Sequence, residues 1–146
     1  MKAIYQRVSS ASVTVDGQTV ASIGPGVLLL VGVTVEDTPR QAALLARKVA
    51  EMRLFTDEHD KFQYAVRDTG GSVLAVSQFT LCANTRHGRR PDFLEAARPK
   101  KALPLFEELV DQLRKAGIAD VQTGRFGADM QVSLVNDGPV TVTLDT

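Results

Sequence analysis

The segment Val27–Val33 constrains the fold most, because every residue in it except Gly32 is apolar. It has the length of a strand and is far shorter than the roughly 18 residues that a membrane-spanning helix needs. A strand that is apolar on both faces is typical of the centre of a sheet that is covered on two sides. The sequence therefore predicts a sheet with other elements packed against it.

Two amphipathic helices are predicted to cover such a sheet. Thr38–Pro39 indicates a helix start, since threonine caps helices and proline suits their first turn. Apolar residues then recur at helical spacing at positions 42, 45, 46, 49 and 52. A second helix is expected from about Leu103 to Ala116, with Gly117 as its C-terminal cap.

Strand patterns occupy most of the remaining chain. Asp16–Gly17 predicts a tight turn between two strands, because glycine adopts positive φ without steric cost. The expected strands and hairpins are 2–15, 18–23, 55–66 (a short hairpin), 72–79, 130–135 and 140–144. A run of strands, then strand and helix twice, then strands again predicts one layered α/β domain of mixed sheets with two main helices over residues 1–146.

Charge and cysteine content exclude several classes of protein. Lys and Arg together number 17, as do Asp and Glu, so the formal net charge is zero and a uniformly basic protein is excluded. The single cysteine, Cys82, excludes an internal disulfide and any multi-cysteine metal site. The first residues lack the apolar core of a signal peptide, so a cytoplasmic protein is expected.

Two short motifs have both a structural and a functional interpretation. In the segment Ser77–Leu81, polar residues follow an apolar strand; they either cap the strand or line a ligand site, since ligands bind at strand ends in α/β sheets. Gly138–Pro139 lies in an apparent turn between two strands. A cis bond there is inexpensive, and it would direct two backbone carbonyls the same way.

A third feature is a concentration of positive charge between residues 84 and 101. Six basic residues against Asp92 and Glu95 give a local net charge of +4; they are Arg86, Arg89, Arg90, Arg98, Lys100 and Lys101. A solvated loop explains this composition. The alternative is a contact with phosphate or with an RNA backbone.

Two of these segments together resemble a known family. Ser77-Gln78-Phe79-Thr80-Leu81 and Asn136-Asp137-Gly138-Pro139-Val140-Thr141 resemble the paired signature of the D-aminoacyl-tRNA deacylases, in order and separation. The resemblance covers essentially the whole chain, including the flanking segments 6–8, 11–15, 70–73, 90–91 and 122–126. One segment departs from the pattern: Phe62–Gln63 follows Lys61, where the family favours Met-Asn.

The resemblance implies a hydrolase that cleaves the ester between a D-amino acid and the terminal ribose of tRNA, and that also removes mischarged glycine. It implies a homodimer in which the segment Ser77–Thr80 of one chain faces Gly138–Pro139 of the other. The family's Gly-Pro bond is cis, and its carbonyls reject L-amino acids. No metal and no cofactor is expected.

Roles for individual residues follow from the same resemblance. Asn136, Thr141 and Arg7 are expected to support the site, and Arg7 makes either a substrate contact or an interface ion pair. The expected tRNA contacts come instead from the charge of the basic segment and are Arg86, Arg89, Arg90, Lys100 and Lys101. Thr80 is either a nucleophile or a positioning residue, and the lack of an evident base favours positioning. An aminoacyl ester is already activated, so positioned water, backbone N–H donors and the RNA 2′-OH are expected to suffice.

Two other functions remain open at this point. A non-catalytic tRNA-binding module would use the basic segment without cleaving an ester. A small-molecule esterase would hydrolyse free D-aminoacyl esters as readily as those attached to tRNA.

Overall fold

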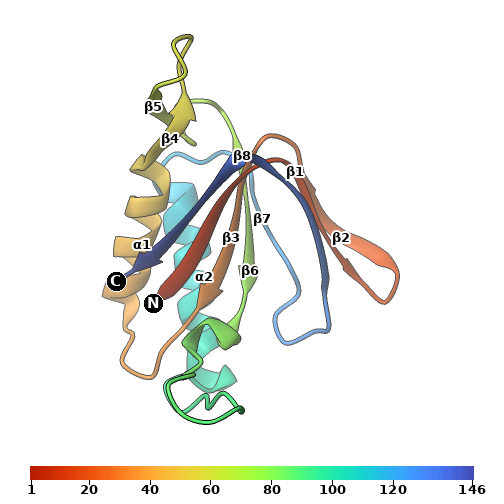
Figure 1. The fold of residues 1–146 in the computed structure, drawn as a ribbon, viewed down its shortest axis with the longest axis vertical. Helices are drawn as coiled ribbons and strands as arrows, with labels where there is room; N and C mark the ends of the chain where they lie inside the picture. The colour runs from red at the N-terminus through yellow and green to blue at the C-terminus, as the bar shows by residue number, and fades with distance from the viewer.

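The computed structural model describes all residues from Met1 to Thr146, and Figure 1 shows their arrangement. Its elements in chain order are β1 (Lys2–Val15), β2 (Gln18–Ile23), β3 (Gly26–Gly32), α1 (Pro39–Glu51), β4 (Arg53–Thr56), β5 (Phe62–Ala65), β6 (Ser72–Ser77), the 3₁₀ helix η1 (Phe79–Cys82), α2 (Pro99–Lys115), β7 (Val121–Thr123) and β8 (Gln131–Asp145). The predicted mixed α/β fold with two main helices is confirmed. None of its helices combines the length and the apolar character that crossing a membrane requires.

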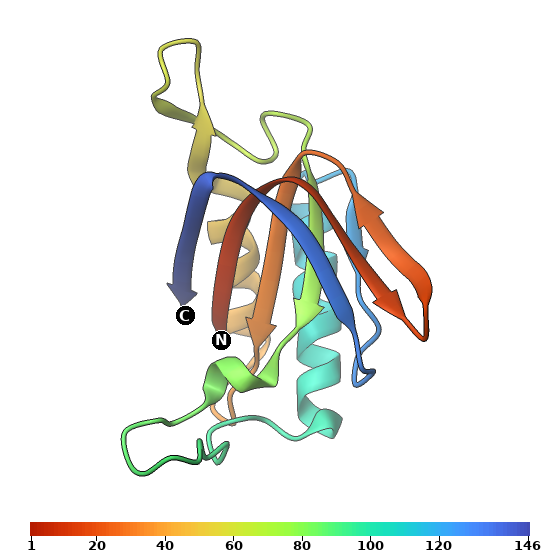
Figure 2. The ribbon, with the colours of Figure 1, turned by 45° about the vertical axis from the view of Figure 1, so that its right-hand side comes forward.

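The main sheet has the order β2-β1-β3-β6-β7, and β8 pairs with β1. β3–β6 and β6–β7 are parallel, whereas the pairs that involve β1 are antiparallel. The first half of β1 pairs with β3 and its second half with β2, so the sheet curls (Figure 2). The Ser22 N–H of β2 donates a 2.9 Å hydrogen bond to Oε1 of Gln122 in β7, which links the two ends of the curled sheet.

The core divides into two clusters on opposite faces of β3. Leu29 belongs to the larger cluster, which lies between the sheet and the helices and includes Leu45 of α1 and Leu109 of α2. Leu28 belongs to the smaller cluster, inside the curl of the sheet. Both side chains are fully buried, so the prediction of a strand covered on two sides is confirmed.

The helices differ from expectation in one respect. α1 begins at Pro39 after Thr38, which forms a capping box with Gln41, as the sequence predicts in outline. α2 begins at Pro99 rather than near Leu103, and Pro104 therefore lies inside it. Ala102, near the start of α2, already belongs to its buried face. Packing of this face keeps the helix continuous through Pro104, although local preference places a proline in the first turn of a helix.

The C-terminal strands were predicted wrongly. The segments near 130–135 and 140–144 are parts of one strand, β8, and the residues between them form a bulge rather than a turn. Thr141 pairs with Gln6 and Asn136 with Val8, so extra residues of β8 are accommodated opposite Arg7. The physical reason is that β8 keeps its pairing with β1 on both sides of the bulge.

Two further differences concern short elements. β6 ends at Ser77 rather than Phe79, because the chain turns into η1. The three-residue strand β7 is absent from the sequence prediction, and its parallel pairing with β6 holds it in the sheet.

Candidate active site

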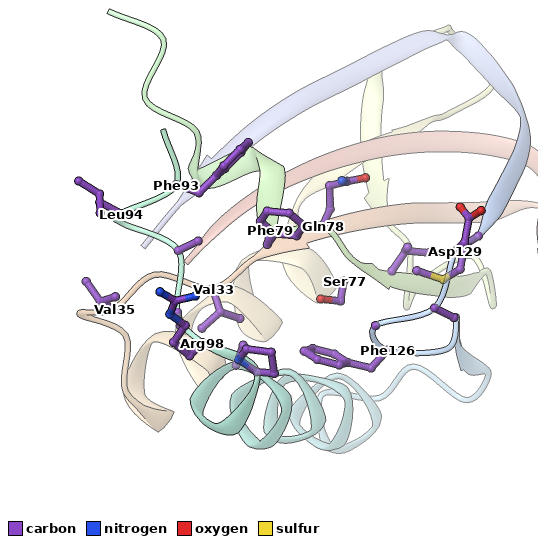
Figure 3. Close-up of a pocket in the computed structure, with 18 of the residues that line it drawn as sticks. Val33, Val35, Ser77, Gln78, Phe79, Phe93, Leu94, Arg98, Phe126 and Asp129 are labelled. Carbon is purple, nitrogen blue, oxygen red and sulfur yellow. The ribbon is translucent and has the colours of Figure 1, made fainter. Parts of the chain in front are cut away.

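A cavity of about 830 Å³ opens where β6 ends, and Ser77, Gln78 and Phe79 line it. Its other walls come from the β3–α1 connection, from the start of α2 and the segment before it, and from the start of β8 and the segment before it. These walls contribute Val33, Val35, Asp92, Phe93, Leu94, Ala96, Ala97, Arg98, Pro99, Ala102, Phe126, Gly127, Ala128, Asp129, Met130 and Val132, together with Val76 of β6. Figure 3 shows Phe79 and Phe93 side by side on one wall, and Ser77 and Phe126 below them.

The backbone turns sharply at this strand end. The Gln78 N–H donates to the Val31 carbonyl at 2.7 Å, and the Leu81 N–H then donates to the Gln78 carbonyl at 3.2 Å. Gly32 allows η1 to lie close to β3, because a Cβ there would come within 2.9 Å of Cys82 Sγ. The backbone N–H groups of Phe79 and Thr80 open the 3₁₀ helix, where the helix itself supplies no acceptor for them.

Thr80 lies beside the cavity rather than in its lining. Its hydroxyl accepts a 2.5 Å hydrogen bond from the Gln78 side-chain amide. An amide N–H is a donor and cannot take up the hydroxyl proton. The two histidines, His59 and His87, are exposed and do not line the cavity. Thr80 therefore has no partner in this chain that would make it a nucleophile.

Phe79 is the most accessible aromatic residue of the cavity, with 55% of its surface exposed. Its ring meets Phe93 edge to face, with the ring centroids 5.1 Å apart. Phe93, Phe126 and Asp129 did not emerge from the sequence as site residues. Tertiary structure brings them to the strand end, and only Phe126 had a signal, in the flanking segment 122–126.

The basic residues lie at the same end of the molecule as this cavity. Arg98 is the N-cap residue of α2 and lines the cavity; it belongs to the basic segment but was not among the expected tRNA contacts. The loop with Arg86, Arg89 and Arg90 is closed by reciprocal backbone hydrogen bonds between Asn84 and Asp92, and Asp92 also lines the cavity. Lys100 and Lys101 are in the first turn of α2, and the Lys101 ammonium donates to the Val35 carbonyl.

Gly138 and Pro139 occupy the bulge of β8, both are exposed, and the peptide bond between them is cis. The Asn136 side chain supports this bulge from within: its Oδ1 accepts from the Val140 N–H at 3.2 Å, and its Nδ2 donates to Thr141 Oγ1 at 2.8 Å. The structure thus brings Asn136 and Thr141 together around the Gly-Pro pair.

Arg7 anchors the same bulge from β1. Only 8% of its surface is exposed. Its Nε lies 3.0 Å from the Asp137 carboxylate, and its Nη1 donates to the Leu54 carbonyl at 2.7 Å. The guanidinium carbon lies 5.9 Å from the ring centroids of both Phe55 and Phe62. Arg7 therefore ties the bulge of β8 to the β4–β5 hairpin.

The two predicted halves of the site do not meet within one chain. No residue from Asn136 to Thr141 lines the cavity. Along β3, Val31 pairs with Ser77, and Val27 pairs with Arg7, which lies opposite the bulge of β8. Ser77 and Arg7 are therefore about 13 Å apart along the strand direction. In Figure 1 the bend of β8 lies near the β4–β5 hairpin, at the opposite end of the molecule from η1.

Two buried groups have altered acidity. Burial raises the pKa of the Cys82 thiol, which is not exposed and lies 3.6 Å from the Val33 carbonyl. Burial also raises the pKa of the Tyr5 hydroxyl, against a smaller opposing effect of Arg7. Both shifts favour the neutral form, so Cys82 fits the interpretation of a small core residue better than that of a nucleophile. No three His, Cys, Asp or Glu side chains are grouped as metal ligands would be.

Comparison with known proteins gives a consistent match. The family model described as D-Tyr-tRNA(Tyr) deacylase matches residues 4–145. The chain is 55% identical to a D-aminoacyl-tRNA deacylase of Roseiflexus castenholzii over 146 residues, which are 100% of this chain and 92% of that protein. It is 56% identical to the D-aminoacyl-tRNA deacylase of Thermomicrobium roseum, covering 100% of this chain and 94% of that one.

Solved structures show the same fold. A structure titled c-Myc DNA Unwinding Element Binding Protein is 40% identical, with a TM-score of 0.95, and the match covers 100% of this chain and 99% of that one. A structure described as a probable eukaryotic D-amino acid tRNA deacylase has a TM-score of 0.87 at 15% identity, with 99% and 98% covered, and it shows the fold alone.

Proposed function

The chain belongs to the D-Tyr-tRNA(Tyr) deacylase family, and from this premise we propose how its own residues perform the reaction. It is a hydrolase that acts on aminoacyl-tRNA, and tRNA carrying a D-amino acid is its substrate partner. We propose that it works as a homodimer in which Ser77–Thr80 of one protomer and Gly138–Pro139 of the other form each active site. The observation that carries this proposal is the separation of the two segments within one chain.

The exposed surface around the bulge supports a partner at this position. β8 (15 residues) pairs with β1 only, so no strand pairs with its other edge. Leu134 and Val135 beside the bulge are 36% and 58% exposed. A long free edge with exposed apolar residues favours association with another chain. In a two-fold dimer both protomers use the same surface, so each Gly138–Pro139 bulge contacts the end of β6 in the partner.

Selection between D- and L-amino acids is proposed to be steric. The carbonyls of Gly138 and Pro139 would fill the space that an L-side chain needs at the α-carbon. Arg7 and Asn136 fix these carbonyls through the contacts described above. Exclusion of this kind rejects a substrate by a clash rather than by a lost attraction. Glycine has no side chain to clash, so mischarged glycyl-tRNA is also a substrate in this proposal.

Hydrolysis is proposed to use water rather than a side-chain nucleophile. Water attacks the ester carbonyl carbon, and the backbone N–H groups of Phe79 and Thr80 stabilise the negative charge that develops on the carbonyl oxygen. The bond to the ribose oxygen then breaks, and the 2′-OH of the RNA assists proton transfer to it. The amide of Gln78 holds the Thr80 hydroxyl in place, which makes Thr80 a positioning residue.

The tRNA is proposed to approach over the basic segment. Arg86, Arg89 and Arg90 are exposed beside the cavity, and Lys100 and Lys101 begin α2 next to it. None of the three arginines takes part in an ion pair within the chain, so they are free for phosphate. Contacts of this kind bind any tRNA and weaken as salt is added.

One assay tests the proposal. Matched D-tyrosyl-, L-tyrosyl- and glycyl-tRNA are incubated with the wild type and with Thr80→Ala, beside a free D-tyrosine ester. We expect cleavage of the D-tyrosyl and glycyl forms, retention of most activity in Thr80→Ala, and much slower cleavage when the terminal ribose is 2′-deoxy.

Equal cleavage of L- and D-tyrosyl-tRNA would refute the steric filter. A trapped acyl-enzyme that is lost in Thr80→Ala would refute attack by water. Salt-sensitive binding without cleavage would instead show a tRNA-binding module, and rapid cleavage of the free ester a small-molecule esterase.

A further inference from the structure

The β4–β5 hairpin presents two largely exposed aromatic rings that the proposed chemistry does not use. Phe62 and Tyr64 are 54% and 45% exposed. They flank Gln63 in β5, where the pairing with β4 shifts register, and both side chains are accessible to solvent. The hairpin projects beyond the main sheet in both ribbon views (Figures 1 and 2). Contact between the Phe62 ring and Arg7 accounts for only part of this exposed surface, the aromatic face, which we define as Phe62 and Tyr64.

Arg7 fixes the aromatic face relative to the Gly138–Pro139 bulge. Its guanidinium lies over the Phe62 ring and pairs with Asp137, which directly precedes Gly138. Its Nη2 lies only 3.1 Å from where a Cβ of residue 138 would be. The bulge and the hairpin are thus held together through one buried side chain. If the bulge enters the partner's active site, the hairpin lies at the same entrance.

The charges on the two sides of that entrance differ in sign. The hairpin from residue 53 to 65 has two basic residues, Arg53 and Lys61, against Asp57, Glu58 and Asp60, a net charge of −1. The partner's segment from 84 to 101 has a net charge of +4. Phosphate groups are therefore drawn toward the partner's basic segment and away from the hairpin, and the uncharged bases are left to face the hairpin.

We propose that the aromatic face binds unpaired bases at the 3′ end of the tRNA by stacking while that tRNA is in the partner's active site. A basic groove for the backbone and aromatic rings for the bases together make the usual surface for single-stranded nucleic acid. In this protein the two components come from different protomers. The inference rests on the proposed cross-subunit site and extends its substrate contacts beyond the terminal ribose.

The test compares a long and a minimal substrate. The variant Phe62→Leu/Tyr64→Leu keeps apolar side chains against Arg7 but removes both rings. We expect its KM for D-tyrosyl-tRNA to rise about tenfold with kcat little changed, because stacking of a base on an aromatic ring is lost. For the D-tyrosyl ester of adenosine, which has no preceding nucleotides, KM and kcat should stay at wild-type values. Phe62→Tyr keeps a ring at this position and should retain the low KM, and Val20→Ala, at an exposed residue on β2, is the matched control that should behave as the wild type.

Three results would overturn the inference. They are an unchanged KM for D-tyrosyl-tRNA, an equal loss on both substrates, and a loss that accompanies dissociation of the dimer in sedimentation. The last two would make the aromatic face a structural or interface element. These results are distinct from failure of the proposed function, which would appear as a wild-type protein that does not cleave D-tyrosyl-tRNA at all.

Discussion

Replacing Arg7 by methionine tests the support of the Gly138–Pro139 bulge most sharply. Methionine has similar length and can still lie between the rings of Phe55 and Phe62, so the substitution removes charge and hydrogen bonds more than volume. Arg53→Met, on the exposed face of the neighbouring β4, is a matched control without an ion pair or side-chain hydrogen bond.

The expected loss of stability follows from the three kinds of contact that Arg7 makes. The 2.7 Å bond to the Leu54 carbonyl comes from a charged donor in a buried side chain and contributes about 1.5–3 kcal/mol. The Asp137 carboxylate is 56% exposed, so its pairing contributes only about 0.2–1 kcal/mol. The two aromatic contacts at 5.9 Å are largely replaced by sulfur–aromatic contacts. The total is about 2–4 kcal/mol, or roughly 6–12 °C in Tm for a domain of this size.

The assay combines thermal unfolding with deacylation kinetics at a temperature where both proteins are folded. We expect Arg7→Met to lower Tm by the stated amount and to reduce kcat/KM for D-tyrosyl-tRNA, because the unsupported bulge no longer holds its carbonyls in one position. Arg53→Met should change neither quantity. A Tm within about 1 °C of the wild type, together with unchanged discrimination between D- and L-tyrosyl-tRNA, would refute the anchoring role of Arg7.

The remaining predictions concern single side chains. Gly138→Ala should abolish most deacylation and cost about 1–3 kcal/mol of stability. Residue 138 has φ of +122°, and a Cβ there would lie 2.8 Å from Val140 Cγ2 and 3.0 Å from the Val140 backbone nitrogen. Unchanged kinetics would contradict this prediction. Phe79→Pro should lower kcat about 10²–10³-fold through loss of one backbone donor, whereas Phe79→Ala, which keeps that donor, should lose far less. Because the pKa of Cys82 is raised in the folded state, the unfolded chain loses its thiol proton first as pH rises, and folding stability should fall above about pH 8.5. This decline, measured by urea unfolding, should be shallower in Cys82→Ala, and identical slopes would refute it.

Features set by neighbouring residues were predictable from the sequence. The turn between β1 and β2 needs positive φ at both central positions, and Asp16 and Gly17 have φ of 50° and 75°. The start of α1 follows from Thr38 and Pro39. The burial of β3 follows from its composition, because a strand that is apolar on both faces has no face to present to water.

Features set by distant residues were not predictable in this way. The bulge in β8 exists because the strand keeps its pairing with β1, about 130 positions away, and locally the same residues are typical of a turn. The three residues of β7 are a strand only beside β6.

The candidate site shows the same division. Ser77, Gln78 and Phe79 stand out in the sequence because polar residues end an apolar strand, and they do line the cavity. Phe93 and Asp129 come from segments with no such pattern, and the fold alone brings them to the cavity. The sequence left two roles open for Arg7. Its observed ion pair, with Asp137 of the same chain, depends on the bulge that local preference did not reveal.

Complementation between two inactive variants tests the cross-subunit site most directly. Gly138→Ala and Phe79→Pro are each refolded alone and then refolded together in equal amounts, and deacylation of D-tyrosyl-tRNA is measured. Random pairing makes about half of the dimers mixed, and each mixed dimer has one site with both halves native, so about a quarter of wild-type activity should return. If the mixture shows only the average of the two parent activities while sedimentation detects mixed dimers, the site lies within a single chain and the account is wrong.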